Sequence, residues 1–350
     1  MIPLPKNRHL NDALLLALCF GAGILVLAGV ILLVRASPVA VAQALAQGAF
    51  GSTYNFANTL VQAVPLLLTG LAVAVSFRCQ LFNIGAEGQL LVGAIAATWV
   101  GTMSLPVALH LPAVLLAGAA AGALWSGIAG ALKIGRGVPE VLSSLLLNFV
   151  AIQMVSWMVR GPLQEADRAF PQSDPVAVPA RFALLLPQTP LHSGVLVAIF
   201  AAVFIWFYLR WTVGGFSLRA VGAGAEAAEA AGIPLARTML QTFLLSGALA
   251  GLGGAVQISG VLYRLSEGFS PGYGYTAIAV ALIAGLSPLA ILPSALFFGA
   301  LTVGGTAVQQ RIPGVSSVVV QVLQAVVLFS LLGYYWAREQ RVKSAGGENK

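Results

Sequence analysis

A polar run, Phe82-Asn83-Ile84-Gly85-Ala86-Glu87-Gly88-Gln89, separates two long apolar stretches. If it is helical, Asn83 and Glu87 lie four residues apart and share a face, with Gln89 close by. A carboxylate at bilayer depth costs roughly 2.5–3.5 kcal/mol on insertion scales, so we expect Glu87 to face a bundle interior or water. Interhelical hydrogen bonding that only holds the bundle together is the alternative. We favour a polar pathway or gate formed by these residues.

Two further groups of polar residues accompany apolar runs. Glu140 begins one run, and Asn148 lies two turns later on nearly the same face. Glu140 equally suits a helix N-terminus, where the helix dipole favours a carboxylate. Near the ends of two later segments fall Gln257, Tyr263, Tyr273 and Tyr275, where the aromatic rings could form an interfacial belt or stack on a planar ligand.

The chain lacks the motifs of nucleotide hydrolysis and of zinc proteases. No G-x-x-x-x-G-K-[ST], H-E-x-x-H or C-x-x-C occurs. The three histidines fall at segment ends or in loops, and the two cysteines lie in or beside apolar runs. We therefore predict no catalytic residues, no metal site, no disulfide framework and no enzymatic activity.

The composition assigns these residues to a membrane protein. Of 350 residues, 59% are hydrophobic and 8% are charged, whereas soluble domains carry about 25% charged residues. Apolar runs of about 20 residues are typical of transmembrane helices, so the predicted fold is an all-α, polytopic membrane helical bundle. The net charge of +7 indicates basic cytoplasmic loops rather than nucleic-acid binding, because no basic patch is present.

The apolar runs predict ten membrane segments with both termini cytoplasmic. Eight or nine segments are the alternatives, since Ser287-Pro288 interrupts the 275–308 region. The first run is too long for the h-region of a cleaved signal peptide, so we expect it to remain as a helix. The predicted segments are 13–34, 56–77, 79–103, 111–132, 138–159, 194–211, 238–258, 275–287, 290–308 and 317–336.

The connecting segments differ in character. Residues 36–55 are predicted to be an external loop or an interfacial helix, and the proline-rich stretch 160–193 an external loop with little regular structure. Within 111–132, small residues recur every four positions and predict close helix packing: Gly118, Gly122, Ser126 and Gly130.

The segment 212–237 is predicted to be cytoplasmic, and its part 218–233 is alanine-rich and helix-prone. Gly232 and Pro234 should end that helix. A short helix of small residues suits insertion into a groove on a partner. An ordinary helix within a loop is the alternative, because it would have the same sequence features.

Five motifs in order resemble a known family. They are Asn83–Gln89, Leu132-Lys133 with Glu140–Asn148, Arg219–Gly222 through Ala231–Ile233, Ser246–Gly254 and Gly268–Gly274. Together, over roughly 60–310, the chain resembles the permease subunits of bacterial ABC importers in the sugar/branched-chain amino acid superfamily, and within it the nucleoside (basic-membrane-lipoprotein-associated) branch. The family usually has Asn-Pro after the Val-Gly pair, where this chain has Ala223-Gly224-Ala225.

The resemblance implies a multi-pass protein of the bacterial inner membrane whose partners perform the ATP hydrolysis. Those partners are a second permease forming a homo- or heterodimer, two ATP-binding subunits that carry ATP and Mg, and an external substrate-binding protein. No cofactor is expected in this chain itself. The chain would be a single permease domain over 1–350, in contact with membrane lipid, with a coupling segment at 209–237. The coupling residues implied there are Arg219, Gly222, Glu226, Ala228, Glu229, Ala231 and Gly232.

The leading hypothesis is therefore an ATP-driven nucleoside permease. Its substrate pathway is expected to involve Asn83, Glu87, Gln89, Glu140, Asn148, Gln257, Tyr273 and Tyr275. A permease of the same type for pentoses or another small polar solute is one alternative. A stand-alone secondary transporter or channel is the other, because broken helices and intramembrane carboxylates also occur there.

Overall fold

The computed structural model describes residues 36–312 continuously, and in addition 21–23, 25–26, 28–29, 31–32, 322, 324–326, 329–330 and 333. The predicted segments 13–34 and 317–336 and both chain termini fall largely outside these residues. The chain divides into two compact units, one of residues 57–299 and one of residues 1–56 with 300–350.

The described residues are helical apart from their loops, as the sequence predicts, and six helices are long and apolar enough to span a membrane. Two of the predicted membrane segments correspond to helices that are too short by that measure. The segment predicted at 79–103 is helical only over α4 (Ala86–Gly101), and α11 spans Tyr273–Ile283. The six long helices are α3 (Thr53–Arg78), α5 (Val107–Arg136), α6 (Glu140–Arg160), α7 (Gly194–Trp211), α10 (Leu235–Gln257) with the π-helical turn η2 (Ile258–Leu262), and α12 (Ile291–Arg311).

Local sequence explains where several of these helices begin and end. Gly137 adopts a left-handed φ of +67° after α5, and its N–H bonds the Lys133 carbonyl at 3.1 Å. Pro139 and Pro234 immediately precede α6 and α10, where the missing proline N–H costs no helical hydrogen bond.

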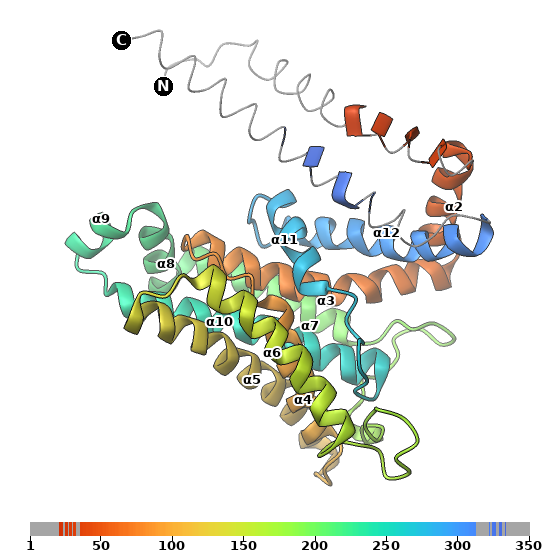
Figure 1. The fold of residues 1–350 in the computed structure, drawn as a ribbon, viewed down its shortest axis with the longest axis horizontal. Helices are drawn as coiled ribbons and strands as arrows, with labels where there is room; N and C mark the ends of the chain where they lie inside the picture. Colours follow the sequence, from red (N-terminus) through yellow and green to blue (C-terminus); the bar gives the residue numbers. More distant parts are fainter. Residues whose placement is uncertain are drawn as a thin grey trace. The chain divides into compact units, whose positions relative to one another are not determined.

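In the unit 57–299, α4, α5 and α10 pack against one another through glycines (Figure 1). A Cβ on Gly122 or Gly247 would collide with the opposite backbone, and Gly251 similarly contacts the backbone at Gly118. The predicted stripe of small residues on α5 is confirmed, because all four of its members are buried. Close backbone approach of this kind is how helices associate where lipid offers no hydrophobic driving force.

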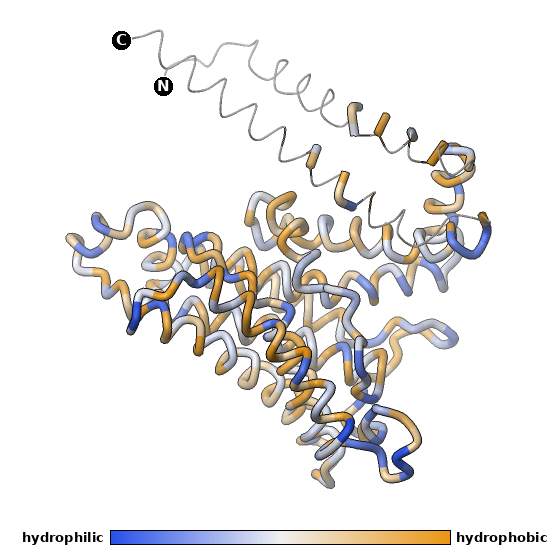
Figure 2. Tube along the Cα trace, viewed as in Figure 1, coloured by the Kyte–Doolittle hydropathy of each residue, from blue (hydrophilic) through white to orange (hydrophobic). Residues whose placement is uncertain are grey.

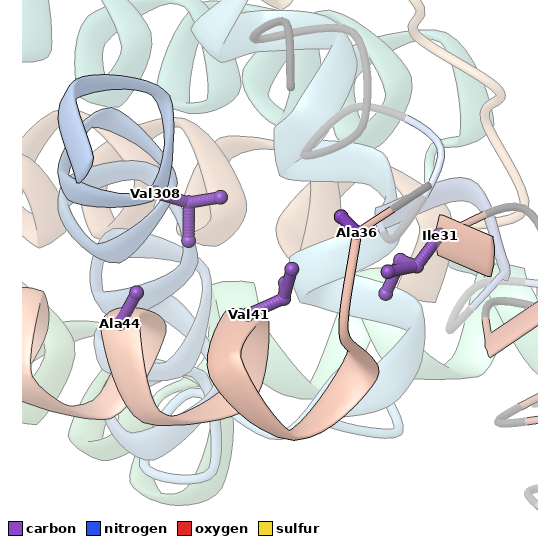
Figure 3. Packing of buried hydrophobic residues seen from close by; sticks show 5 residues of the cluster. All are labelled: Ile31, Ala36, Val41, Ala44 and Val308. Atoms are coloured by element: carbon purple, nitrogen blue, oxygen red, sulfur yellow. The ribbon is translucent and has the colours of Figure 1, made fainter. Parts of the chain in front are cut away.

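In the other unit, α2 (Pro38–Phe50) packs against the last part of α12. Val41 and Ala44 of α2 meet Val308 of α12 in an apolar cluster (Figure 3). Arg311 also donates to the Gln47 side chain at 2.8 Å. Of the two alternatives for 36–55, the structure therefore supports a helix rather than a loop.

Hydrophobic positions run along the helices of the unit 57–299, whereas hydrophilic ones gather in the loop after α6 and in the α8–α9 segment (Figure 2). Large apolar side chains remain exposed on α5, α6 and α7, as expected for helices whose outer faces meet lipid. They include Leu116, Leu124, Phe149, Phe200 and Phe207. The loop 160–193 contains one short 3₁₀ turn, η1 (Val178–Ala180), and two isolated β-bridges, which confirms its predicted irregularity.

Candidate functional site

Asn83 forms the centre of a buried hydrogen-bond network just before α4. Its side-chain N–H groups donate to Ser246 Oγ of α10 at 3.1 Å and to Ser126 Oγ of α5 at 3.4 Å. Its Oδ1 accepts from the Gly85 N–H and from Gln89 Nε2, both at 3.0 Å. Ser246 in turn donates to a carbonyl of α3. Asn83 and Gln89 are therefore brought together, in contacts that link four helices.

Side chains on α6 hold the non-helical stretch that leads into α4. The Phe82 N–H donates to Glu140 Oε1 at 3.4 Å, and the Ile84 N–H donates to Ser144 Oγ at 3.1 Å. Lys133 pairs with the other Glu140 oxygen at 2.8 Å. Glu140 thus binds protein groups on both oxygens, at one end of α6.

Asn148 continues this polar face one turn further into α6. Its Oδ1 accepts from the Gly88 N–H at 2.8 Å, and its Nδ2 donates to the Ile84 carbonyl at 3.0 Å. The first turn of a helix leaves N–H groups without intrahelical partners, so Asn148 caps α4 from a neighbouring helix. Its Nδ2 also lies 3.3 Å from the Tyr275 hydroxyl.

Glu87 joins α4 to the start of α11. Its Oε2 accepts from the Gly274 N–H at 2.7 Å, close to the helix N-terminus where negative charge is favoured. A Cβ on Gly274 would collide with the Glu87 backbone, so the two helix starts touch main chain to main chain. The Glu87 side chain is buried, in agreement with the expectation that it faces inward.

A cavity of about 370 Å³ opens beside Glu87, between α4, α6 and the segment before α11. Leu91, Ile152 and Val155 supply its apolar wall. The polar groups that line it come from all three elements: Glu87, Gln153, Ser156, Glu267, Ser270 and Tyr275.

Glu267 and Arg160 form an ion pair at this cavity. Arg160 Nε and one terminal nitrogen donate to the two Glu267 oxygens at 2.7 and 2.9 Å, and Ser156 also donates to Glu267. These hydrogen bonds lower the pKa of Glu267 to about 2, so the carboxylate is ionised at neutral pH. Arg160 is consequently engaged by Glu267 and does not present a free positive charge to the cavity.

Tyr273 and Gln257 lie in a different polar cluster from Tyr275. The Tyr273 hydroxyl donates to Gln62 Oε1 of α3 at 2.9 Å, and Gln257 also hydrogen-bonds to Tyr273. Neither residue lines the cavity. The expected grouping of Gln257, Tyr273 and Tyr275 therefore separates into two environments on opposite sides of the α11 start.

Sequence reasoning missed several cavity residues, namely Gln153, Ser156, Glu267 and Ser270. Ser156 lies eight residues after Asn148, and thus on the same face of a helix as Glu140, Ser144 and Asn148, so the spacing of polar residues could have indicated it. Glu267 and Ser270 lie between the predicted segments 238–258 and 275–287, and nothing in the local sequence indicates that this stretch meets α6. Across the described part of the chain, no three His, Cys, Asp or Glu side chains group as metal ligands.

The alanine-rich segment forms two helices where a single one was predicted. α8 (Val213–Ala223) ends at Gly224, and α9 (Ala225–Ala230) follows. Gly224 has an extended φ of 172°, so the helical backbone is interrupted at this residue. Gly232 takes a left-handed φ of +83° after α9, so the predicted stop is confirmed.

The two helices present buried small residues and exposed charges. Gly222 contacts the carbonyl of Arg78, the last residue of α3, closely enough to leave no room for a Cβ. Ala228 is buried, whereas Ala231, Gly232 and the charged residues are exposed. The exposed charged residues are Arg219, Glu226 and Glu229.

Comparison with known proteins finds related membrane permeases. The family described as "Branched-chain amino acid transport system / permease component" matches residues 55–332. A glucose ABC transporter permease of Haloferax volcanii is 42% identical over 83% of this chain and 79% of its own length. A guanosine ABC transporter permease of Bacillus subtilis is 37% identical over 93% of each chain. A nucleoside ABC transporter permease of Lactococcus lactis is 33% identical over 80% of each chain.

Proposed function

The chain belongs to the family of permease components of branched-chain amino acid transport systems, and we propose that it is the nucleoside-carrying permease of an ATP-driven importer. It is an ABC transporter permease, an integral membrane protein and a translocation subunit rather than an enzyme. Its family implies an ATP-binding component and a substrate-binding component as partners. This replaces the alternative of a stand-alone secondary transporter or channel.

Two relatives support a nucleoside as the solute. The guanosine permease aligns over 93% of both chains, and the nucleoside permease aligns over 80% of both. The glucose permease, at 42% identity, favours a hexose as the second candidate. Nucleosides and sugars are both uncharged and rich in hydroxyl groups, so one permease architecture can serve either.

The proposed assembly contains a second permease, identical or different, two ATP-binding subunits that hold ATP and Mg, and an external substrate-binding protein. The chain would act as one permease domain of about ten membrane segments with both termini cytoplasmic. The short α4 and α11 would complete that number, together with segments near the two ends. In this arrangement 160–193 faces outward and 209–237 faces the ATP-binding subunits.

The observation that carries the coupling mechanism is the contact between Gly222 and the Arg78 carbonyl. Arg78 ends α3, and five residues later the same stretch reaches Asn83, the centre of the buried network. A movement of α8 and α9 imposed by an ATP-binding partner would therefore reach α3 and the start of α4 through direct backbone contact. Exposed Glu226 and Glu229 would bind that partner.

The substrate pathway is proposed to follow the polar face of α6 and the starts of α4 and α11. Glu87, Asn148 and Tyr275 belong to this path directly, because Glu87 and Tyr275 line the cavity and Asn148 bonds Tyr275. The non-helical stretch before α4 would act as a hinge. Its position would be held by hydrogen bonds from Asn83, Gln89 and Glu140. Tyr273 and Gln257 would position the start of α11 through Gln62.

The test is uptake by the whole importer, reconstituted in proteoliposomes with its ATP-binding and substrate-binding partners. We expect ATP-dependent uptake of radiolabelled guanosine that exceeds uptake of glucose. Uptake of glucose alone would overturn the nucleoside assignment, and uptake by this chain without ATP would overturn the ATP-driven mechanism.

The coupling assignment is tested in the same assembly. Glu226→Arg, or replacement of 225–231 by a Gly-Ser sequence, should abolish the stimulation of ATPase activity by the loaded binding protein. Unchanged stimulation in both variants would show that α9 is not the coupling element. Asp167→Asn, an exposed change in the loop after α6, serves as the matched control.

A further inference from the structure

The cavity beside Glu87 offers hydrogen-bond acceptors without a free positive charge. Its volume of about 370 Å³ lies within the roughly 300–1,000 Å³ of small-molecule sites. Glu87 and Glu267 contribute carboxylates, and the nearby cation, Arg160, is held by Glu267 through two hydrogen bonds. Among the described residues that line the cavity, none is a lysine, arginine or histidine.

The remaining polar groups can serve a ligand that both donates and accepts hydrogen bonds. The Gln153 amide bonds to no residue that the structure describes, and the Tyr275 hydroxyl accepts from Asn148 and keeps its own hydrogen for donation. Leu91, Ile152 and the Tyr275 ring provide apolar surface. Such a mixture of apolar wall and a few convergent polar groups is typical of sites for small organic molecules.

We propose that this cavity is a solute-binding site within the permease that selects uncharged, hydroxyl-rich molecules and rejects their phosphate esters. Glu87 accepts hydrogen bonds from solute hydroxyl or ring N–H groups, Gln153 binds a second polar group, and the Tyr275 ring contacts the apolar face of the solute. A phosphate group would lie beside the Glu267 carboxylate and would find no unpaired cation among the described residues that line the cavity.

The choice of guanosine as probe rests on the proposed function, but the charge selectivity does not. A glucose-carrying permease would need the same preference against its phosphorylated sugar. The experiment therefore includes both solutes, so that failure of the cavity assignment and failure of the nucleoside assignment give different results.

The experiment measures equilibrium binding of radiolabelled guanosine and glucose to the full chain in lipid nanodiscs, by scintillation proximity. Unlabelled guanosine 5′-monophosphate and glucose 6-phosphate are the competitors. We expect saturable binding of one uncharged solute, and competition by its phosphate ester that is weaker by about tenfold or more, the factor that corresponds to 1.4 kcal/mol.

Three variants locate the binding. Glu87→Gln keeps an acceptor for the Gly274 N–H but removes one carboxyl oxygen, and it should weaken solute binding about tenfold because the solute loses a hydrogen-bond acceptor. Gln153→Leu changes an exposed residue that the fold does not require, and it should also weaken solute binding. This second variant keeps the test valid if Glu87→Gln does not fold. Asp167→Asn, outside the cavity, should bind like the unmodified chain.

Each outcome decides the proposal. Equal competition by the phosphate ester, unaltered binding in Gln153→Leu and Glu87→Gln, or no saturable binding of either solute would overturn the cavity assignment. Binding of glucose but not guanosine, lost in the same variants, would support the cavity and overturn the nucleoside assignment. If the importer takes up guanosine but both variants bind solute normally, the proposed function is supported and the cavity assignment is wrong.

Discussion

The Asn148 side chain and the Gly88 backbone N–H form a 2.8 Å hydrogen bond that ties the middle of α6 to the first turn of α4. The same side chain donates to the Ile84 carbonyl at 3.0 Å. In lipid, an irregular backbone stretch is tolerated where protein groups satisfy it. Asn148 therefore allows α4 to begin only at Ala86, although the sequence on both sides of this non-helical stretch is apolar.

Replacing Asn148 by alanine should destabilise the chain. The change leaves the Gly88 N–H and the Ile84 carbonyl without these partners, and each buried unsatisfied group costs about 1–3 kcal/mol. Thermal melting in nanodiscs, followed by fluorescence-detected size exclusion, measures the effect. Val150→Ala, an exposed change on the same helix, is the control. Equal melting of the two variants would contradict the capping role.

The sequence predicted the helical class, the long segments and the packing stripe on α5, because length, hydropathy and four-residue spacing are local properties. Glu87 was expected to face a bundle interior or water, and its side chain is buried. The sequence did not predict that 79–85 is non-helical, because the backbone of this stretch is satisfied by side chains of another helix, Glu140, Ser144 and Asn148.

The cavity was not predictable from single segments. The residues that line it come from three elements: α4, α6 and the stretch 267–272. In addition, the ion pair between Glu267 and Arg160 joins residues 107 positions apart in sequence. Tyr273 and Tyr275 were expected together because they are neighbours in the sequence. On the first turn of α11 they point to different partners, Gln62 and Asn148.

Alanine at Gly274 should separate the starts of α4 and α11. Its Cβ would collide with the Glu87 backbone, and overpacking of this kind typically costs about 1–3 kcal/mol. Melting and guanosine uptake should both decrease. Gly135→Ala is the matched control, because a Cβ there meets nothing within 4 Å and alanine is the better helix former. A Gly274→Ala chain as stable as that control would refute the close contact.

His192 should make the stability of the loop before α7 sensitive to acid. Its ring is buried, stacks on Phe182 and accepts from the Gly194 N–H at 3.1 Å. Burial lowers its pKa from 6.5 to about 4, so the unfolded chain binds a proton at higher pH than the folded chain. The stabilising contribution of the neutral His192 is therefore fully present above pH 6.5. The free energy of unfolding should decrease from there toward pH 4, by at most about 1.4 kcal/mol per pH unit.

Melting measured between pH 7 and pH 5 tests this dependence. The unmodified chain should lose stability over that interval, and His192→Gln should give a flatter profile because its side chain does not titrate. The two profiles are compared as differences from pH 7, so that any general loss of stability in the variant cancels. Parallel profiles would assign the acid sensitivity to other groups.

Gly222 and Gly224 offer a matched pair for the coupling mechanism. A Cβ on Gly222 would run into the Arg78 carbonyl, whereas the nearest neighbour of a Cβ on Gly224 is Ala227 at 3.9 Å. Gly222→Ala should therefore displace α8 from the end of α3 and reduce ATP-driven guanosine uptake about tenfold or more, the change expected for 1.4 kcal/mol. Gly224→Ala should leave uptake close to that of the unmodified importer, since the φ of 172° at this position is extended backbone that alanine also adopts.

Solute binding to the Gly222→Ala permease alone should persist, because the cavity beside Glu87 lies on other elements. Equal uptake by both variants would mean that the contact between α8 and α3 transmits nothing to the transport path.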